Sequence, residues 1–298
     1  PGMSAPPSRD LWRGRLALAG AMTFVGSTVA ASAAASDLDP FLAALIRFAT
    51  ATPALLALCV LFGTKWPRLN AREWGVLALQ SAAGSLGYTA ALVAGLRYAS
   101  AADASILTGL LPTLTALVAV VALGERPGAR LAVAVALATA GAALIALREG
   151  AGGEQRLFGL ALVFAAMFGE SLFAVLNKAI RTPIEPLAVA TIMSAIALAL
   201  GVAPGLWALA RDGAPDMPAL WAMVYYGLGP TVVGFSLWYW GAARVSGVEA
   251  AAYMAVAPLA ALALSWALLG ESLAARHFVG MAFVLAAIAL TVARRRAG

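Results

Sequence analysis

Cysteine and histidine are almost absent from this sequence. The chain of 298 residues has one of each, Cys59 and His277. A single cysteine excludes a disulfide within the chain, and so few Cys and His residues remove the usual ligand sets for zinc, haem and iron–sulfur centres. We therefore expect no metal site, no cofactor and no catalytic residues.

Charged residues are also scarce, at 11% of the chain, whereas 62% of the residues are hydrophobic. A water-soluble domain usually carries about 25% charged residues, so we expect a lipid bilayer to surround most of this chain. The formal net charge is +6, but the cations lie in short loops between apolar runs. They form no extended basic face with interleaved aromatic residues, which argues against nucleic acid as a partner.

Apolar runs long enough to cross a bilayer follow one another along the chain. A hydrocarbon core about 30 Å thick requires roughly 20 residues of helix. Ten runs of about this length are bounded by charge, Pro or Gly: 15–36, 41–63, 73–97, 102–123, 128–148, 156–178, 186–209, 218–241, 247–269 and 274–293. The sequence therefore predicts an all-α integral membrane protein with ten transmembrane helices and short connecting loops.

One segment of the chain recurs 146 positions later. The first copy contains Gly95, Ser100, Asp103, Ala104, Pro112 and Leu123-Gly124-Glu125, and the second contains Gly241, Ser246, Glu249, Ala250, Pro258 and Leu269-Gly270-Glu271. The same offset relates Asp39-Pro40 to Glu185-Pro186. Each copy spans five runs, and an odd number of crossings turns the second copy upside down. We therefore predict two inverted five-helix repeats, 15–148 and 156–293, an arrangement typical of transporters.

The distribution of cations predicts the orientation in the membrane. If the N-terminus is cytoplasmic, fourteen Lys and Arg residues fall on the inner side and five fall outside, while Arg47 lies within the second run. Because cytoplasmic loops are enriched in Lys and Arg, both termini should be cytoplasmic. The segment 1–14 is then a cytoplasmic N-terminal extension, in which Pro1-Gly2 ahead of Met3 is expected to be an expression scar. The first apolar run is expected to be a span and not a cleaved signal.

These motifs resemble the EamA-type branch of the drug/metabolite transporter superfamily. The resemblance is carried by residues 99–105, Pro112 and residues 123–126 in the first half, by residues 246–251, Pro258 and Gly270-Glu271 in the second, and by Asp39-Pro40 with Arg47-Phe48. It implies a ten-span carrier of inverted repeats that exports small metabolites from bacterial cells, nearest to the branch that exports aromatic and neutral amino acids. Val25 precedes Gly26-Ser27 where family members commonly have Trp, so any family role of that Trp does not transfer.

Glu170 is the main candidate for contact with a transported substrate. It lies near the middle of the run 156–178, where an ionisable side chain is expected to face a cavity or a partner. Helical spacing places it on one face with Met167, Ala174 and Asn177, which would suit an ammonium group and an apolar side chain. A structural Glu that is hydrogen-bonded to a neighbouring helix is the alternative.

Polar and aromatic residues of other runs are further candidates. Ser85 and Tyr88 share a face of the third run, Ser27 lies in the first, Trp238 follows Thr231 by seven residues, and Tyr253 enters the ninth. Helix contacts or an interfacial aromatic belt would also explain these residues. The candidate substrate-binding residues are therefore Ser27, Ser85, Tyr88, Glu170, Asn177, Trp238 and Tyr253.

Two prolines occupy equivalent places in the repeats and are candidates for gating. Pro112 and Pro258 lie near the middle of their runs, where each removes a backbone donor and bends the helix.

Other polar residues are expected to be structural. We expect Asp103 and Glu249 to cap helices, Glu125 and Glu271 to lie in hairpins at the membrane surface, and His277 to be interfacial. Arg47 is expected to pair with an acid near the outer interface.

The sequence as a whole predicts a multi-pass carrier of the bacterial inner membrane, with a small-molecule substrate, most simply a monomer. Its central cavity would open alternately to each side and move amino acids with apolar or aromatic side chains. One alternative is a carrier of other metabolites such as nucleotide-sugars or sugar-phosphates, which would require a cation at mid-membrane. A membrane-embedded enzyme and a pore-forming bundle are the alternatives from other classes, and the scarcity of catalytic groups argues against the enzyme.

Overall fold

The computed structural model describes residues 8–123, 128–146 and 153–292, which form helices and their connections without a strand. The first half contains α1 (Ser8–Ala34), α2 (Pro40–Leu61), α3 (Ala71–Ser81), η1 (Ala82–Gly87), α4 (Tyr88–Gly95), α5 (Ala101–Thr108), α6 (Leu111–Leu123) and α7 (Ala129–Ala146). The second half contains α8 (Gly153–Leu176), η2 (Asn177–Ala179), α9 (Pro186–Asp212), α10 (Met217–Tyr226), η3 (Gly227–Gly234), α11 (Phe235–Ala242), α12 (Gly247–Tyr253), α13 (Val256–Leu269) and α14 (Ala275–Val292). The expected hairpin residues Gly124-Glu125-Arg126 lie outside the described residues.

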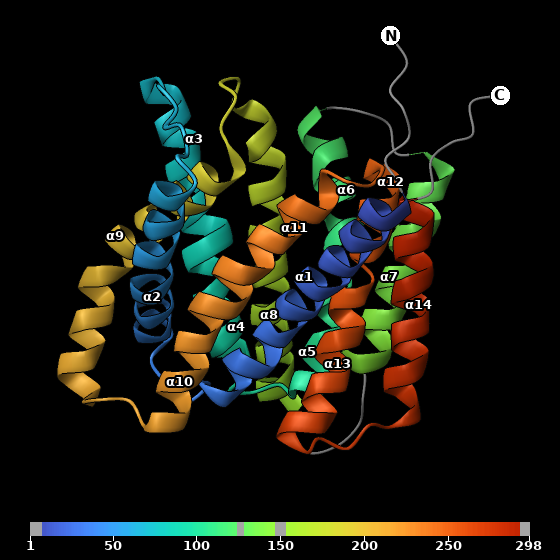
Figure 1. Cartoon of the computed structure of the whole chain (residues 1–298). Helices are drawn as coiled ribbons and strands as arrows, with labels where there is room; N and C mark the ends of the chain where they lie inside the picture. The colour runs from blue at the N-terminus through green and yellow to red at the C-terminus, as the bar shows by residue number, and fades with distance from the viewer. Residues whose placement is uncertain (1–7, 124–127, 147–152, 293–298) are drawn as a thin grey trace, which may run out of the picture.

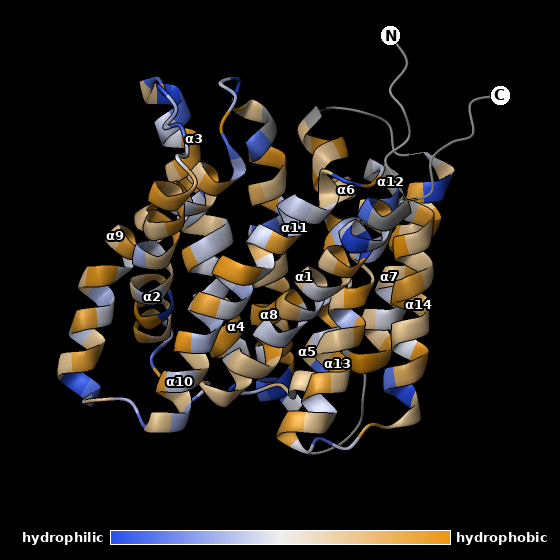
Figure 2. Cartoon of the chain, viewed as in Figure 1, coloured by the Kyte–Doolittle hydropathy of each residue, from blue (hydrophilic) through white to orange (hydrophobic). Residues whose placement is uncertain are grey.

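Seven of the described helical segments are long and apolar enough to cross a membrane, and the bent pair α5–α6 makes an eighth. The remaining two of the ten expected runs correspond to α7 and α14, which are shorter apolar helices. Hydrophilic residues gather at the two ends of the molecule, with apolar helices between them (Figure 2). The chain is therefore a multi-pass membrane protein, whereas ten crossings remain a prediction.

Polar side chains cap the N-terminal ends of several helices. Asp39 accepts a hydrogen bond from Phe41 N at 2.9 Å with Pro at the first position of α2. Ser100 and Ser246, one repeat apart, accept equivalent hydrogen bonds from Asp103 N and Glu249 N at 3.1 and 3.2 Å. Each satisfies a backbone donor that a helix start leaves free, so the repeated Ser explains two equivalent helix starts.

Two π-helical segments also recur at the repeat offset. η1 lies between α3 and α4, and η3 lies between α10 and α11. Such segments widen a helix by one residue per turn and are frequent at functional sites. Here both border the central cavity described below.

The first helix of each half packs against helices of the other half. α1 packs extensively on α13 and α11, and α8 packs on α4 and α6. A Cβ added to Gly159 of α8 would lie 2.7 Å from the Gly95 carbonyl oxygen, and one added to Gly241 would lie 2.8 Å from that of Gly14. Glycine is therefore required at both crossings, because the two backbones approach too closely for a side chain.

The two halves also meet through equivalent helices. α2 packs on α9, and α7 packs on α14. α1 begins and α14 ends at the same end of the molecule, and the α2–α3 and α9–α10 connections lie at opposite ends (Figure 1). Helices of both halves thus surround a shared centre.

Candidate functional site

A cavity with two adjoining chambers lies where the two halves meet. The first chamber, of about 200 Å³, is lined from α1, α2, η1, α4, α6, α8, α9, α10, η3 and α11. The second, of about 290 Å³, is lined from α1, α4, α5, α6, α8, η3, α11 and α13. The chambers share Val25, Thr28, Tyr88, Leu111, Glu170, Phe173, Pro230 and Phe235. This lining is mostly apolar and aromatic, with few polar groups, as is usual for small-molecule sites.

Glu170 lies on the wall common to both chambers. Its helix α8 packs tightly here, because a Cβ on the preceding Gly169 would lie 2.6 Å from the Ala83 carbonyl oxygen. Among the described residues its carboxylate has no direct hydrogen bond or ion pair. Glu170 is therefore available to a ligand, and the alternative of a Glu hydrogen-bonded to a neighbouring helix does not describe it.

Other residues selected from the sequence also line this cavity. Ser85 lines the first chamber, Tyr88 lines both, and Trp238 lines the second. Pro112 and Pro258 line the second chamber as well, each just after a break in its helix. The axes of α5 and α6 differ by 44° at the first break. Five residues from distant parts of the sequence thus meet Glu170 at one cavity.

Three selected residues lie away from the chambers. Ser27 shares a hydrogen bond of 2.8 Å with the Tyr225 hydroxyl and lines a separate groove between α1, α10 and α13. Asn177 is exposed in η2, because α8 ends before it and the shared helical face no longer applies. Tyr253 ends α12 outside both linings. In α1 the neighbouring Thr28 faces both chambers instead.

The expectation that Arg47 pairs with an acid near the outer interface is wrong, because its direct partners are hydroxyl groups and aromatic rings. Its Nε donates to Thr231 Oγ1 at 3.1 Å and its Nη1 donates to Thr89 Oγ1. The guanidinium carbon lies 4.0 Å from the ring centroid of Tyr226 and 4.6 Å from that of Phe48. Arg47 also lines the first chamber with Glu170. The sequence signal was an arginine within an apolar run, but the run alone did not show which groups would surround it.

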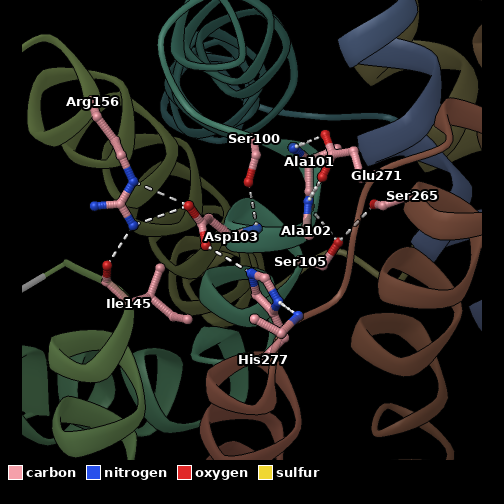
Figure 3. A network of polar contacts seen from close by, with 11 residues as sticks. Ser100, Ala101, Ala102, Asp103, Ser105, Ile145, Arg156, Ser265, Glu271 and His277 are labelled. Atoms are coloured by element: carbon pink, nitrogen blue, oxygen red, sulfur yellow. Dashed lines mark hydrogen bonds and ion pairs between the residues drawn. The ribbon is translucent and has the colours of Figure 1, made fainter. Parts of the chain in front are cut away.

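A buried polar cluster links α5, α8 and α14 away from the cavity (Figure 3). Asp103 Oδ2 accepts from Arg156 Nε and Nη2 at 3.1 and 3.0 Å, and Asp103 Oδ1 lies 3.1 Å from His277 Nε2. Ala274 N donates to His277 Nδ1 at 2.9 Å, so the ring proton lies on Nε2 and the imidazole donates to Asp103. Asp103 and His277 are each 1% exposed. Asp103 lies in the first turn of α5, as expected, but its carboxylate contacts Arg156 and His277 instead of capping the helix, and His277 is buried within the protein.

The carboxylate that caps α5 comes from the other half of the chain. Ala101 N and Ala102 N donate to the two carboxylate oxygens of Glu271 at 2.8 and 2.7 Å (Figure 3). A carboxylate at this end of a helix is favoured by the helix dipole. Glu271 thus links the hairpin between α13 and α14 to the first half. Within the described ranges, no group of His, Cys, Asp and Glu side chains could hold a metal ion.

Comparison with known proteins bears on this arrangement. The model of the EamA-like transporter family matches residues 13–147 and 157–293. A Bacillus subtilis transporter, YetK, is 31% identical over 288 residues, covering 94% of this chain and 87% of that protein. A probable terminal-alkyne amino-acid exporter of Streptantibioticus cattleyicolor is 31% identical over 258 residues, covering 85% of each chain. A solved crystal structure with 20% sequence identity covers 93% of this chain and 95% of its own at a TM-score of 0.64, which shows a shared fold.

Proposed function

This chain belongs to the EamA-like transporter family, and on that basis we propose that it exports amino acids with apolar or aromatic side chains. The observation that carries the proposal is the carboxylate of Glu170, which has no direct partner among the described residues and faces a largely apolar and aromatic cavity. A carboxylate binds an ammonium group, while Tyr88, Phe173 and Trp238 offer surface to a side chain. The amino-acid exporter among the relatives supports this substrate class.

We propose alternating access between two inverted five-helix repeats as the mode of transport. The equivalent contacts of Gly95 with Gly159 and of Gly241 with Gly14 support a twofold relation between the halves. Ten crossings, with α5–α6 and α12–α13 each as one broken span, agree with this relation. Pro112 and Pro258 follow equivalent helix breaks beside the cavity, and we assign them to gating. Ser85, Tyr88, Glu170 and Trp238 are the substrate contacts that the cavity supports.

The proposed location is the bacterial inner membrane, with both termini cytoplasmic, on the strength of the cation distribution. A membrane-embedded enzyme is disfavoured because the cavity lining contains neither Cys nor His, and the family consists of transporters.

Arg47 in the cavity gives some support to the alternative of a sugar-phosphate or nucleotide-sugar carrier, which needs a cation there. However, Glu170 lines the same chamber and would repel a phosphate. A single arginine opposed by a carboxylate is better matched to a zwitterion than to a dianion.

Counterflow in proteoliposomes tests this function. Vesicles that contain the purified chain are loaded with each of the twenty amino acids, and uptake of labelled phenylalanine is followed with and without a pH gradient. We expect saturable counterflow for apolar and aromatic amino acids. Glu170→Gln should lower it by about tenfold or more, because an ammonium loses a charge-assisted hydrogen bond.

Glu185→Gln is the matched control, because Glu185 is exposed before α9 and its side chain makes no capping hydrogen bond. It should transport like the wild type. The site assignment fails if Glu170→Gln and Tyr88→Ala both leave the flux unchanged, and flux that does not saturate would indicate a pore.

A further inference from the structure

Arg47 is held in a fixed position on the cavity wall. Thr89 and Thr231 each accept one of its hydrogen bonds, and Phe48 and Tyr226 place their rings against the guanidinium. Thr231 lies within η3, and Thr89 follows η1 by two residues. Both hydroxyls are therefore positioned by the π-helical segments, so four contacts from four elements fix the arginine.

These contacts use only part of the hydrogen-bonding capacity of Arg47. A guanidinium carries five N–H donors, and the contacts from Nε and Nη1 occupy two of them. Nη2 has no hydrogen-bond partner among the described residues. The atom is not buried, so a ligand can reach it. Both N–H groups of Nη2 and one of Nη1 thus remain for a ligand, and a guanidinium can bind a carboxylate through two such groups.

The charge of Arg47 is not neutralised by a direct ion pair. Glu170 attracts it through space, but no salt bridge joins the two. An ionisable group within the membrane costs roughly 2.5–3.5 kcal/mol, and neutral hydroxyls do not remove its charge. The charge of Arg156, by contrast, is neutralised by a direct ion pair with Asp103.

Arg47 and Glu170 both line the first chamber and form no direct ion pair, so each is left to contact one charge of a ligand. Because the threonines and rings hold the guanidinium in place, it does not collapse onto the carboxylate. We propose that Arg47 binds the α-carboxylate of the transported amino acid and makes that carboxylate a requirement for recognition. This inference rests on the proposed function and deepens it, with the ammonium group at Glu170 and the side chain among the aromatic residues.

A purely structural role for Arg47 makes a different prediction. If the residue only links α2 to α4 and η3, its replacement will impair the protein equally toward every substrate. A carboxylate receptor instead affects only those compounds that carry the carboxylate. The ratio between two such compounds therefore separates the roles.

The experiment measures competition with labelled phenylalanine in proteoliposomes. The competitors are phenylalanine, phenylalaninamide and phenethylamine, which share a ring and an amine and differ at the carboxylate. We expect the wild type to bind phenylalanine about 10- to 100-fold more tightly than either amine, as a charge-assisted bidentate contact implies. This comparison needs no variant, so it holds even if a substitution at Arg47 prevents folding.

The variants then locate the effect. Arg47→Gln should weaken the binding of phenylalanine by about tenfold or more and leave the binding of phenethylamine, measured by its own uptake, nearly unchanged. Arg47→Lys should bind phenylalanine with an affinity between those of the wild type and Arg47→Gln, because lysine keeps the charge but cannot form the bidentate contact. Arg68→Gln is the control, since Arg68 is exposed in the α2–α3 connection, and it should match the wild type.

Equal affinities for phenylalanine and phenethylamine in the wild type would overturn the assignment, and so would an Arg47→Gln variant that weakens both compounds equally. In either case saturable amino-acid transport would leave the proposed function standing. If the wild type moves no amino acid at all, the proposed function fails and the assignment fails with it.

Discussion

Two arginines in apolar surroundings have different kinds of partner in this molecule. Arg156 is 8% exposed and donates twice to Asp103, whereas Arg47 contacts hydroxyls and rings beside a cavity. Removal of one partner from a buried ion pair leaves a charge that neither water nor a counter-ion stabilises. We therefore expect the first arginine to matter for stability, and the second to act in ligand binding as proposed above.

The repeat supplies a matched pair of sites that tests this difference. Asp103 and Glu249 are equivalent in sequence, but Asp103 is buried with Arg156, and the Glu249–Arg15 pair is partly exposed at 29% and 44%. Asp103→Asn should destabilise the protein by about 3–5 kcal/mol, and Glu249→Gln by about 0–1 kcal/mol. Thermal unfolding in detergent, followed by fluorescence, measures both. Equal losses would show that burial does not set the strength of these two pairs.

Part of the candidate site could be predicted from single residues. Glu170, Ser85, Tyr88 and Trp238 were selected as polar or aromatic groups within apolar runs, and all of them line the cavity. Tyr226 was not selected, because tertiary packing alone brings its ring against Arg47. Helical periodicity likewise predicted Ser27 where Thr28 faces the chambers, since one residue rotates a side chain by about 100°.

The bounds of a helix were predicted well where an uninterrupted apolar run defines them, and less well where the helix is interrupted. The runs for α2 and α9 agree with the structure to within a few residues. The third and eighth runs contain the π-helical segments η1 and η3, which hydropathy does not indicate. Proline did mark the fourth and ninth runs, where α5–α6 and α12–α13 break just before Pro112 and Pro258.

The crossing of α4 and α8 gives a prediction about helix packing. A methyl group at Gly159 would lie 2.7 Å from the Gly95 carbonyl oxygen, whereas one at Gly75 of α3 would meet nothing within 4 Å. Gly159→Ala should therefore destabilise the protein by about 1–3 kcal/mol through overpacking. Gly75→Ala should leave it unchanged or stabilise it by up to about 1 kcal/mol. The same unfolding assay compares them, and a neutral Gly159→Ala would mean that the helices separate at little cost.

The arrangement of the halves follows from contacts between them that hydropathy does not contain. α1 packs on helices of the second half and α8 on helices of the first, so neither half forms its own compact bundle. The Glu271 carboxylate on α5 adds a polar link of the same kind. The sequence repeat indicated that the halves are equivalent, but their mutual packing required the three-dimensional structure.

The proposed inversion of the halves can be tested by the side of the membrane on which equivalent connections lie. The α2–α3 and α9–α10 connections follow equivalent helices and lie at opposite ends of the molecule (Figure 1). Cys59 is buried, and Cys59→Ser provides a background without a thiol. Single cysteines are then introduced by Lys65→Cys and Ala214→Cys, both at exposed positions.

A membrane-impermeant maleimide applied to intact cells should label Ala214→Cys, and should label Lys65→Cys only after the membrane is opened, because the cation-rich side is expected to be cytoplasmic. Labelling of both positions in intact cells, or of neither, would contradict the inversion. Labelling of Lys65→Cys alone would keep the inversion and reverse the orientation, which would place both termini outside. The experiment thus tests two predictions separately. The twofold relation requires that only one of the two connections is accessible from outside, and the cation bias predicts which one.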